Sequence, residues 1–305
     1  MMTTGKPLYL FTHSGRLRFY AKVCIFILCG TGSVLIFPYM PYGNAFTFEY
    51  FTLGIILISA ALIHFVEKRP FASLGLAWNA FTTRHIYWGF GVGAVLITIA
   101  VTMLNGFGYA EIEAGYWTWD SVSHLCANQF VFFFFAAAVE ELLFRGYLFQ
   151  AAIESSNVTV AVIASSLLFS IVHSWNPGIT GLAYCNIFIA GLLFAGAYIR
   201  TRQLWLPIAL HAGWNFFQGT IYGADISGVS LGGHLLTTSL SGPEWLTGGA
   251  FGPEGSIFTT LVLILGIVAV QALPQFQISP EQYVLWHRIR YAEDYAEVFP
   301  VGNAS

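Results

Sequence analysis

Charged side chains are scarce in this sequence of 305 residues, at 9% of the total. An average soluble domain carries about 25% of them, and a water-soluble globule of this size cannot cover its surface with so few. No run of basic residues is present, which argues against a nucleic acid as a partner. Intrinsic disorder is excluded as well, because hydrophobic residues make up 56% of the chain.

Cysteine is also rare, with four residues that mostly lie in apolar stretches without the spacing of metal ligands. This favours small buried side chains and excludes a disulfide scaffold. The zinc pattern His-Glu-x-x-His is absent, and no pair of aspartates falls within an apolar run. The segment 228–232 has the Gly-x-Ser-x-Gly spacing of a nucleophilic serine, but it lacks the strand-to-helix context that gives this pattern its meaning.

Long apolar runs dominate what is present. A membrane-spanning helix needs about 20 mostly apolar residues, and the sequence predicts eight such spans. We therefore expect an all-α, polytopic membrane protein, with an eight-transmembrane-helix bundle that forms a single domain over residues 1–305. The predicted spans are 22–40, 48–66, 87–107, 124–152, 157–175, 180–199, 203–222 and 256–274.

The charges are divided between the two sides of this predicted bundle. All 12 Lys and Arg residues lie at or toward one side, whereas the connections on the other side carry acidic residues and no basic ones. The positive-inside rule then places both termini, about 1–21 and 275–305, in the cytoplasm. The acidic residues of the opposite side are Glu49, Glu111, Glu113, Asp120, Asp225, Glu244 and Glu254.

Ionisable residues within spans are functional candidates, because a bilayer makes them costly. Glu141 and Arg145 are four apart in the span 124–152, so they can pair along one helix face. The adjacent Glu140 points about 100° away and has no partner on its own helix. A lone carboxylate there needs a partner from another helix or a metal ion, which predicts a chemical role for Glu140.

Two further spans carry histidines. His173 lies just before Asn176 and a proline, which end its predicted helix. His211 and Asn215 are four apart and share a helix face. Two histidines, an amide and the carboxylate of Glu140 on three helices form a candidate site for peptide hydrolysis, inside a cavity among the helices.

Two mechanisms fit these residues. In the first, Glu140 and His173 activate a water, with Glu140 as general base, while His211 and Asn215 donate hydrogen bonds to the developing oxyanion. In the second, Glu140, His173 and His211 bind zinc and leave one coordination position for water. The sequence leaves the choice between no cofactor and Zn²⁺ open.

The motifs resemble those of a known family. Glu-Glu-x-x-x-Arg at 140–145, Phe-x-x-x-His at 169–173 and His-x-x-x-Asn at 211–215 are similar, in order and spacing, to the three motifs of the CPBP (Abi) family, which includes type II CAAX prenyl endopeptidases. The protease-like core is expected at about 124–222. The resemblance implies an eight-helix intramembrane protease of glutamate or metal type. It implies catalytic roles for Glu140, His173, His211 and Asn215, with Glu141 and Arg145 in support.

The sequence thus predicts an intramembrane endopeptidase that acts on a peptide or membrane-protein substrate, prenylated or not. The alternative is a non-enzymatic membrane immunity factor or scaffold of the same family. We expect a multi-pass protein in a lipid bilayer, with a bacterial inner membrane favoured over the endoplasmic reticulum.

Overall fold

The computed structural model describes residues 19–26, 46–66 and 68–290. Most of the predicted first span, 22–40, lies outside these residues, as do the ends of both predicted cytoplasmic termini. Residues 19–26 are helical. The remaining helices are α2 (Phe46–Ala61), α3 (Thr82–Gly106), α4 (Trp119–Arg145), α5 (Tyr147–Ser155), α6 (Val158–Val172), α7 (Gly181–Thr201), α8 (Trp205–Phe216), α9 (Glu244–Thr247), α10 (Ile257–Ala272) and α11 (Pro280–Arg290).

Several single turns of helix supplement these elements. Two are π-helical, η2 (Leu62–Val66) at the end of α2 and η5 (Phe217–Ile221) at the end of α8. The 3-10 turns are η3 (Phe71–Leu74), η4 (His173–Trp175), η6 (Gly249–Phe251) and η7 (Pro253–Gly255).

Four of the predicted spans are matched by helices long and apolar enough to cross a membrane. They are Thr82–Gly106, Trp119–Ser155, Val158–Trp175 and Gly181–Thr201. The segments predicted at 48–66 and 256–274 contain shorter apolar helices, Gly54–Phe65 and Ile257–Ala272. In the described residues the structure therefore supports an integral membrane protein with several apolar helices, and it leaves the count of eight as a prediction.

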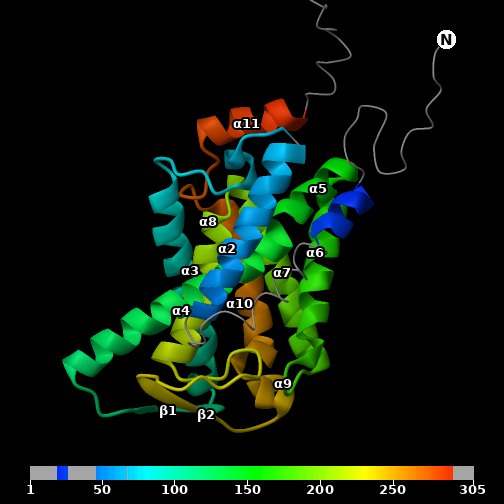
Figure 1. The fold of residues 1–305 in the computed structure, drawn as a ribbon. Helices are drawn as coiled ribbons and strands as arrows, with labels where there is room; N and C mark the ends of the chain where they lie inside the picture. The colour runs from blue at the N-terminus through cyan, green and yellow to red at the C-terminus, as the bar shows by residue number, and fades with distance from the viewer. Residues whose placement is uncertain (1–18, 27–45, 67, 291–305) are drawn as a thin grey trace, which may run out of the picture.

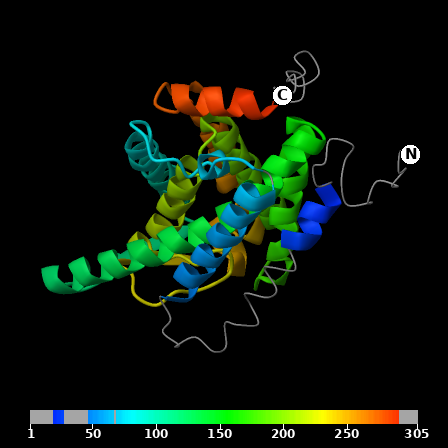
Figure 2. The same ribbon diagram turned by 45° about the horizontal axis from the view of Figure 1, so that its top comes forward.

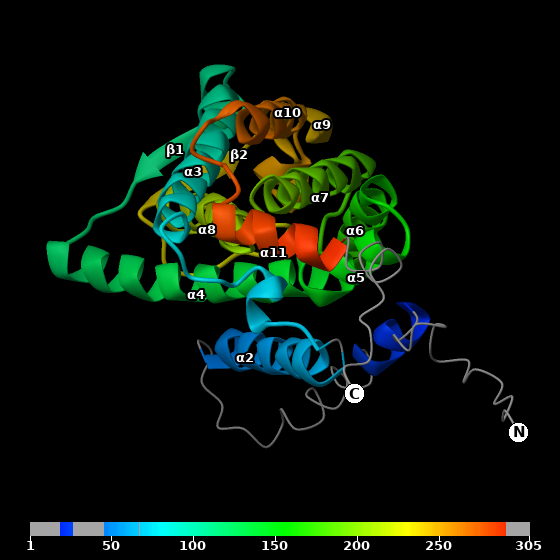
Figure 3. The same ribbon diagram turned by 90° about the horizontal axis from the view of Figure 1, so that it is seen from above.

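The segment 203–222 is a central helix. Its α8 is buried along nearly its whole length and lies between α3, α4 and α7 (Figure 3). A helix that is apolar over most of its surface is typical of such a buried position. Gly93 of α3 allows a close approach, because a Cβ there would lie 2.0 Å from the carbonyl oxygen of Leu210.

The fold is mainly helical, but it also contains a short two-stranded ribbon, and in this respect the expectation of an all-α protein needs correction. Strands β1 (Ala110–Ala114) and β2 (Leu236–Leu240) pair antiparallel, with Ala110 opposite Leu240. They lie at the end of the bundle opposite α11 (Figure 1). Because β2 falls within the connection between the predicted spans 203–222 and 256–274, the ribbon ties this connection to the one between α3 and α4.

The predicted span 124–152 is divided into two helices. Helix α4 begins at a capping box between Thr118 and Ser121 and ends at Gly146, where the backbone leaves the helical region before α5. The first part of α4 projects beyond the neighbouring helices (Figure 2), and Trp119 is almost fully exposed there. The second part packs within the bundle and carries the motif 140–145.

Candidate active site

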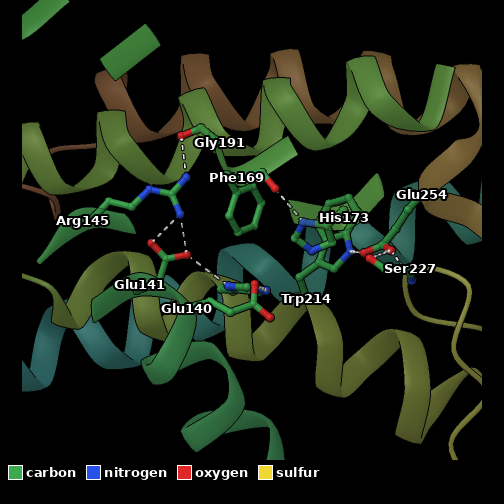
Figure 4. A network of polar contacts seen from close by, with 10 residues as sticks. Glu140, Glu141, Arg145, Phe169, His173, Gly191, Trp214, Ser227 and Glu254 are labelled. Atoms are coloured by element: carbon green, nitrogen blue, oxygen red, sulfur yellow. Dashed lines mark hydrogen bonds and ion pairs between the residues drawn. The ribbon is translucent and has the colours of Figure 1, made fainter. Parts of the chain in front are cut away.

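The motif of α4 forms a buried ion pair. Nη1 of Arg145 donates to both carboxylate oxygens of Glu141, at 3.0 and 3.2 Å, and Nη2 donates to the carbonyl oxygen of Gly191 at 3.0 Å (Figure 4). Both side chains are fully buried. The pairing expected from their spacing is therefore confirmed, and it extends to the backbone of α7.

The surroundings of Arg145 explain how its charge is accommodated. Its guanidinium group lies 4.6 Å from the ring centre of Phe169 and 5.5 Å from that of Phe194, within the range of cation–π attraction. Gly191 has no side chain to separate the helices, since a Cβ there would lie 2.8 Å from Cβ of Ser166. Helices α6 and α7 can therefore pack closely where α7 presents its carbonyl to Arg145.

His211 of α8 links this ion pair to Glu140. Its Nδ1 lies 3.1 Å from Oε1 of Glu141, and its Nε2 lies 3.9 Å from Oε2 of Glu140. The imidazole stacks on Phe194, with ring centres 4.7 Å apart. Among the described residues, Oε2 of Glu140 is buried without a hydrogen-bond partner. A buried acceptor left in this state is costly, so this oxygen is suited to hold a water or a substrate group.

His173 follows the last residue of α6, in the 3-10 turn η4. Its Nδ1 is 2.7 Å from the carbonyl oxygen of Phe169, so Nδ1 carries the proton that it donates, and Nε2 is left as an acceptor in the neutral ring. Asn176 has extended backbone angles and caps η4, so the helical segment stops before Asn176 and the proline, as predicted. The side-chain amide of Asn176 donates to the carbonyl oxygen of Ser227 at 3.0 Å.

The structure brings the predicted residues to one cavity of about 230 Å³. Its walls are mainly aromatic and aliphatic, and polar contacts are stronger beside such a lining of low dielectric constant than in bulk water. The polar groups of the wall come from α4, the end of α6, α7, α8 and the loop that precedes α10. They include Glu140, His173, Asn176, Asn186, His211, Asn215, Ser227 and Glu254.

The residues proposed as zinc ligands do not group together here. Among the described residues, no three His, Cys, Asp or Glu side chains lie close enough to hold a metal ion. Nε2 of His211 lies 3.9 Å from Oε2 of Glu140, whereas Nδ1 of His173 is engaged by the carbonyl oxygen of Phe169 (Figure 4). The arrangement does not fit a three-ligand zinc site, so no step below depends on a metal.

Glu254 is a cavity residue that the sequence pattern did not indicate. It was grouped with the external acidic residues, but it lies in η7 and lines the cavity. Its Oε1 accepts from Nε1 of Trp214 at 3.0 Å, and its Oε2 accepts from the amide of Ser227 at 2.6 Å and from the hydroxyl at 2.7 Å. Burial raises the pKa of the Glu254 carboxyl, and these hydrogen bonds oppose the shift.

Comparison with known proteins finds a family that matches the part of the chain carrying these residues. Residues 122–217 match the family described as type II CAAX prenyl endopeptidase Rce1-like. This range includes Glu140, Glu141, His173 and His211. The chain is 36% identical over 80 residues to the "Putative membrane peptidase YdiL" of Bacillus subtilis (strain 168), covering 26% of this chain and 30% of that protein.

Two further relatives are more distant. The chain is 25% identical over 201 residues to the "Uncharacterized protein YyaK" of Bacillus subtilis (strain 168), covering 60% of this chain and 62% of the relative. It is 26% identical over 176 residues to an "Uncharacterized 24.3 kDa protein" of Escherichia coli, with coverage of 56% and 79%. The chain thus covers less than two thirds of the length of each of the first two relatives.

The matched family and the apolar helices indicate a membrane protein that resembles membrane peptidases. Residues 122–217 of this chain match the model of the type II CAAX prenyl endopeptidase Rce1-like family. The resemblance drawn from the three motifs is confirmed.

Proposed function

We propose that this protein is an intramembrane endopeptidase that hydrolyses a peptide bond with a water activated by Glu140. One observation supports this most directly. Glu140, His173, His211 and Asn215 come from three different parts of the Rce1-like domain, and all four line a single apolar cavity. Polar side chains that converge in a dry cavity are what hydrolysis of an unreactive amide requires.

Glu140 is the general base in this proposal. Its unpartnered Oε2 would accept a proton from the attacking water and deliver it to the leaving amine. His173, with Nε2 free to accept, would hold the water from the other side of the cavity. The peptide carbonyl would then lie between these two residues and α8.

His211 and Asn215 are proposed to stabilise the oxyanion. When Nδ1 of His211 donates to Glu141, a second proton on Nε2 makes that nitrogen a donor toward the cavity. Asn215, one turn further along α8, lines the same cavity and offers an amide donor. Glu141 and Arg145 would support the site by holding His211 in this orientation.

The substrate is proposed to be a peptide or membrane protein whose cleaved segment reaches this cavity. The family name implies a prenylated C-terminal CAAX tetrapeptide as one candidate, and an unprenylated peptide is the other. We further propose that both termini face the cytoplasm and that the membrane is a bacterial inner membrane rather than the endoplasmic reticulum.

The test is cleavage of a panel of quenched peptides, prenylated and unprenylated, by purified protein in detergent. Glu140→Gln keeps the size of the side chain and removes the base. A general base contributes about 10²–10⁴-fold, so a loss of at least about 10²-fold is expected with the melting temperature retained. The matched control is Glu113→Gln, an exposed carboxylate on β1 outside the cavity, which should cleave like the wild type.

Each reaction is repeated with a zinc chelator. Retention of activity supports water activation by protein groups alone, whereas loss that zinc restores would select the metal mechanism instead. If folded wild type cleaves no peptide in the panel, or if Glu140→Gln cleaves as well as wild type, the proposal fails. A non-enzymatic immunity factor or scaffold then becomes the favoured function.

A further inference from the structure

A tight turn forms one wall of the cavity. The backbone amides of Ile226 and Val229 each donate to the other's carbonyl oxygen, at 3.0 and 2.9 Å. The two residues between them have positive φ angles, 48° at Ser227 and 80° at Gly228. This is the φ pattern of a type I′ turn. Ile226, Ser227 and Val229 all line the cavity.

Serine is an unfavourable residue at the first of these positions, where glycine, asparagine and aspartate are preferred. Its left-handed conformation therefore needs support from elsewhere. Glu254 supplies it, because one carboxylate oxygen accepts from both the amide and the hydroxyl of Ser227. The second oxygen is held by the indole of Trp214, so the carboxylate cannot rotate freely.

The same turn is connected to His173. The carbonyl oxygen of Ser227 accepts from the side chain of Asn176, and the amide of Asn176 donates to the carbonyl oxygen of His173 at 3.0 Å. On the other side, Trp214 directly precedes Asn215 on α8. A single carboxylate thus connects the segment that carries His173 with the segment that carries Asn215.

We propose that Glu254 is a positioning residue of the site, which fixes the Ile226–Val229 turn and through it the placement of His173 opposite α8. This inference rests on the proposed function, since it assigns a role within that same cavity. Glu254 does not take part in the chemistry itself. Its effect is to keep the two sides of the cavity at the separation that hydrolysis needs.

Replacement Glu254→Gln tests this role. An amide of the same shape turns one acceptor into a donor, and that donor would face the donors of either Ser227 or Trp214. We expect kcat to fall about tenfold with KM changed less than about twofold, because small misplacements of catalytic groups lower the rate. Glu244→Gln, an exposed carboxylate in the same loop, is the matched control and should leave both constants unchanged.

A second substitution distinguishes positioning from a general loss of structure. Glycine adopts positive φ without cost, so Ser227→Gly removes the need for Glu254 at the turn. The double variant Ser227→Gly/Glu254→Gln should recover at least about half of the lost kcat. A double variant no faster than Glu254→Gln alone would overturn the proposed route through the turn.

Hydrogen–deuterium exchange gives a readout that is independent of activity. In Glu254→Gln, the amides of Ser227 and Val229 should exchange at least about fivefold faster, while peptides from α3 keep their rates. Unchanged exchange at the turn, or faster exchange with unaltered kcat, would overturn the inference. If wild type cleaves no peptide, the proposed function fails and Glu254 has no active site to position. The exchange rates still show whether Glu254 holds the turn.

Discussion

The imidazole of His211 lies between two adjacent carboxylates of α4, with Nδ1 3.1 Å from Oε1 of Glu141 and Nε2 3.9 Å from Oε2 of Glu140. The two glutamates therefore have different environments although they are neighbours in sequence. The carboxylate of Glu141 accepts hydrogen bonds from Arg145 and His211, whereas Oε2 of Glu140 has no hydrogen-bond partner among the described residues. This difference supports the proposal that Glu141 holds the site together and that Glu140 is the general base.

Removal of Arg145 should destabilise the protein strongly. Arg145→Met leaves Glu141 buried without its cation, a change that costs about 3–5 kcal/mol in comparable buried pairs. Thermal unfolding in detergent should show this loss. The double variant Glu141→Gln/Arg145→Met removes both charges and should recover a large part of it. If the double variant is no more stable than Arg145→Met, the uncompensated charge is not the cause.

Lysine at position 145 should not restore the full stability that Arg145 provides. A single ammonium group cannot donate in parallel to Glu141 and to the carbonyl of Gly191 while lying over Phe169. We expect Arg145→Lys to be less stable than wild type and more stable than Arg145→Met, by the same unfolding measurement. Wild-type stability in Arg145→Lys would mean that the contact with Gly191 contributes little.

Asn215→Leu should lower the rate while leaving the fold intact. The variant keeps a similar volume in an apolar cavity but removes the proposed oxyanion donor. Loss of one such donor costs about 10²–10³ in kcat. Steady-state kinetics on the cleaved peptide should show this fall with KM little changed. A rise in KM at constant kcat would instead assign Asn215 to substrate binding.

The contact of α3 with α8 should be sensitive to single methyl groups. In Gly93→Ala the new Cβ would lie 2.0 Å from the carbonyl oxygen of Leu210 and 2.8 Å from the amide of Trp214. Since backbone must move, a loss of about 1–3 kcal/mol is expected. Gly91→Ala is the matched control on the same helix, because its Cβ would meet nothing within 4 Å.

The two glycines are compared by melting temperature and by cleavage rate. Gly91→Ala should be as stable as wild type or more so, since alanine favours a helix over glycine by about 1 kcal/mol. Gly93→Ala should also lose activity, because it displaces the helix that carries His211. Equal behaviour of the two variants would contradict the close approach of α3 and α8.

The structural features that depend on local residue spacing were predictable from the sequence. The pair Glu141–Arg145 follows from a separation of four residues on one helix. The end of η4 at Trp175 follows from Asn176 and the proline after it. Four spans were recognisable because an apolar run of about 20 residues is typical of a helix that crosses a membrane. Such features require no knowledge of which helices are neighbours.

Contacts between distant segments were not predictable in the same way. The sequence did not indicate that His211 lies beside Glu140, a contact that arises because α8 packs next to α4. The strands β1 and β2 have five residues each and lie more than a hundred residues apart, so neither gives a pattern on its own. Glu254 was grouped with the acidic residues of one side of the bundle, because its hydrogen-bond partners come from other elements and leave no local pattern.

The stability of the protein should carry a pH dependence that originates at Glu254. Burial raises the pKa of this carboxyl in the folded state above its ordinary value of 4.5, which it keeps in the unfolded chain. Between the two values the folded protein binds more protons than the unfolded one. The free energy of unfolding therefore falls as pH rises through this window, and it levels off above the folded-state pKa.

Glu254→Gln has no titrating group at this position, so it isolates the effect. The difference in melting temperature between wild type and Glu254→Gln should shift in favour of wild type as the pH is lowered from neutral toward 4.5. Glu113→Gln, at an exposed site, controls for the loss of a carboxylate that is not buried. A difference that shifts in favour of wild type as the pH is raised would mean that the hydrogen bonds from Ser227 and Trp214 outweigh burial. In that case the carboxylate would be held in its charged form by the turn that it supports.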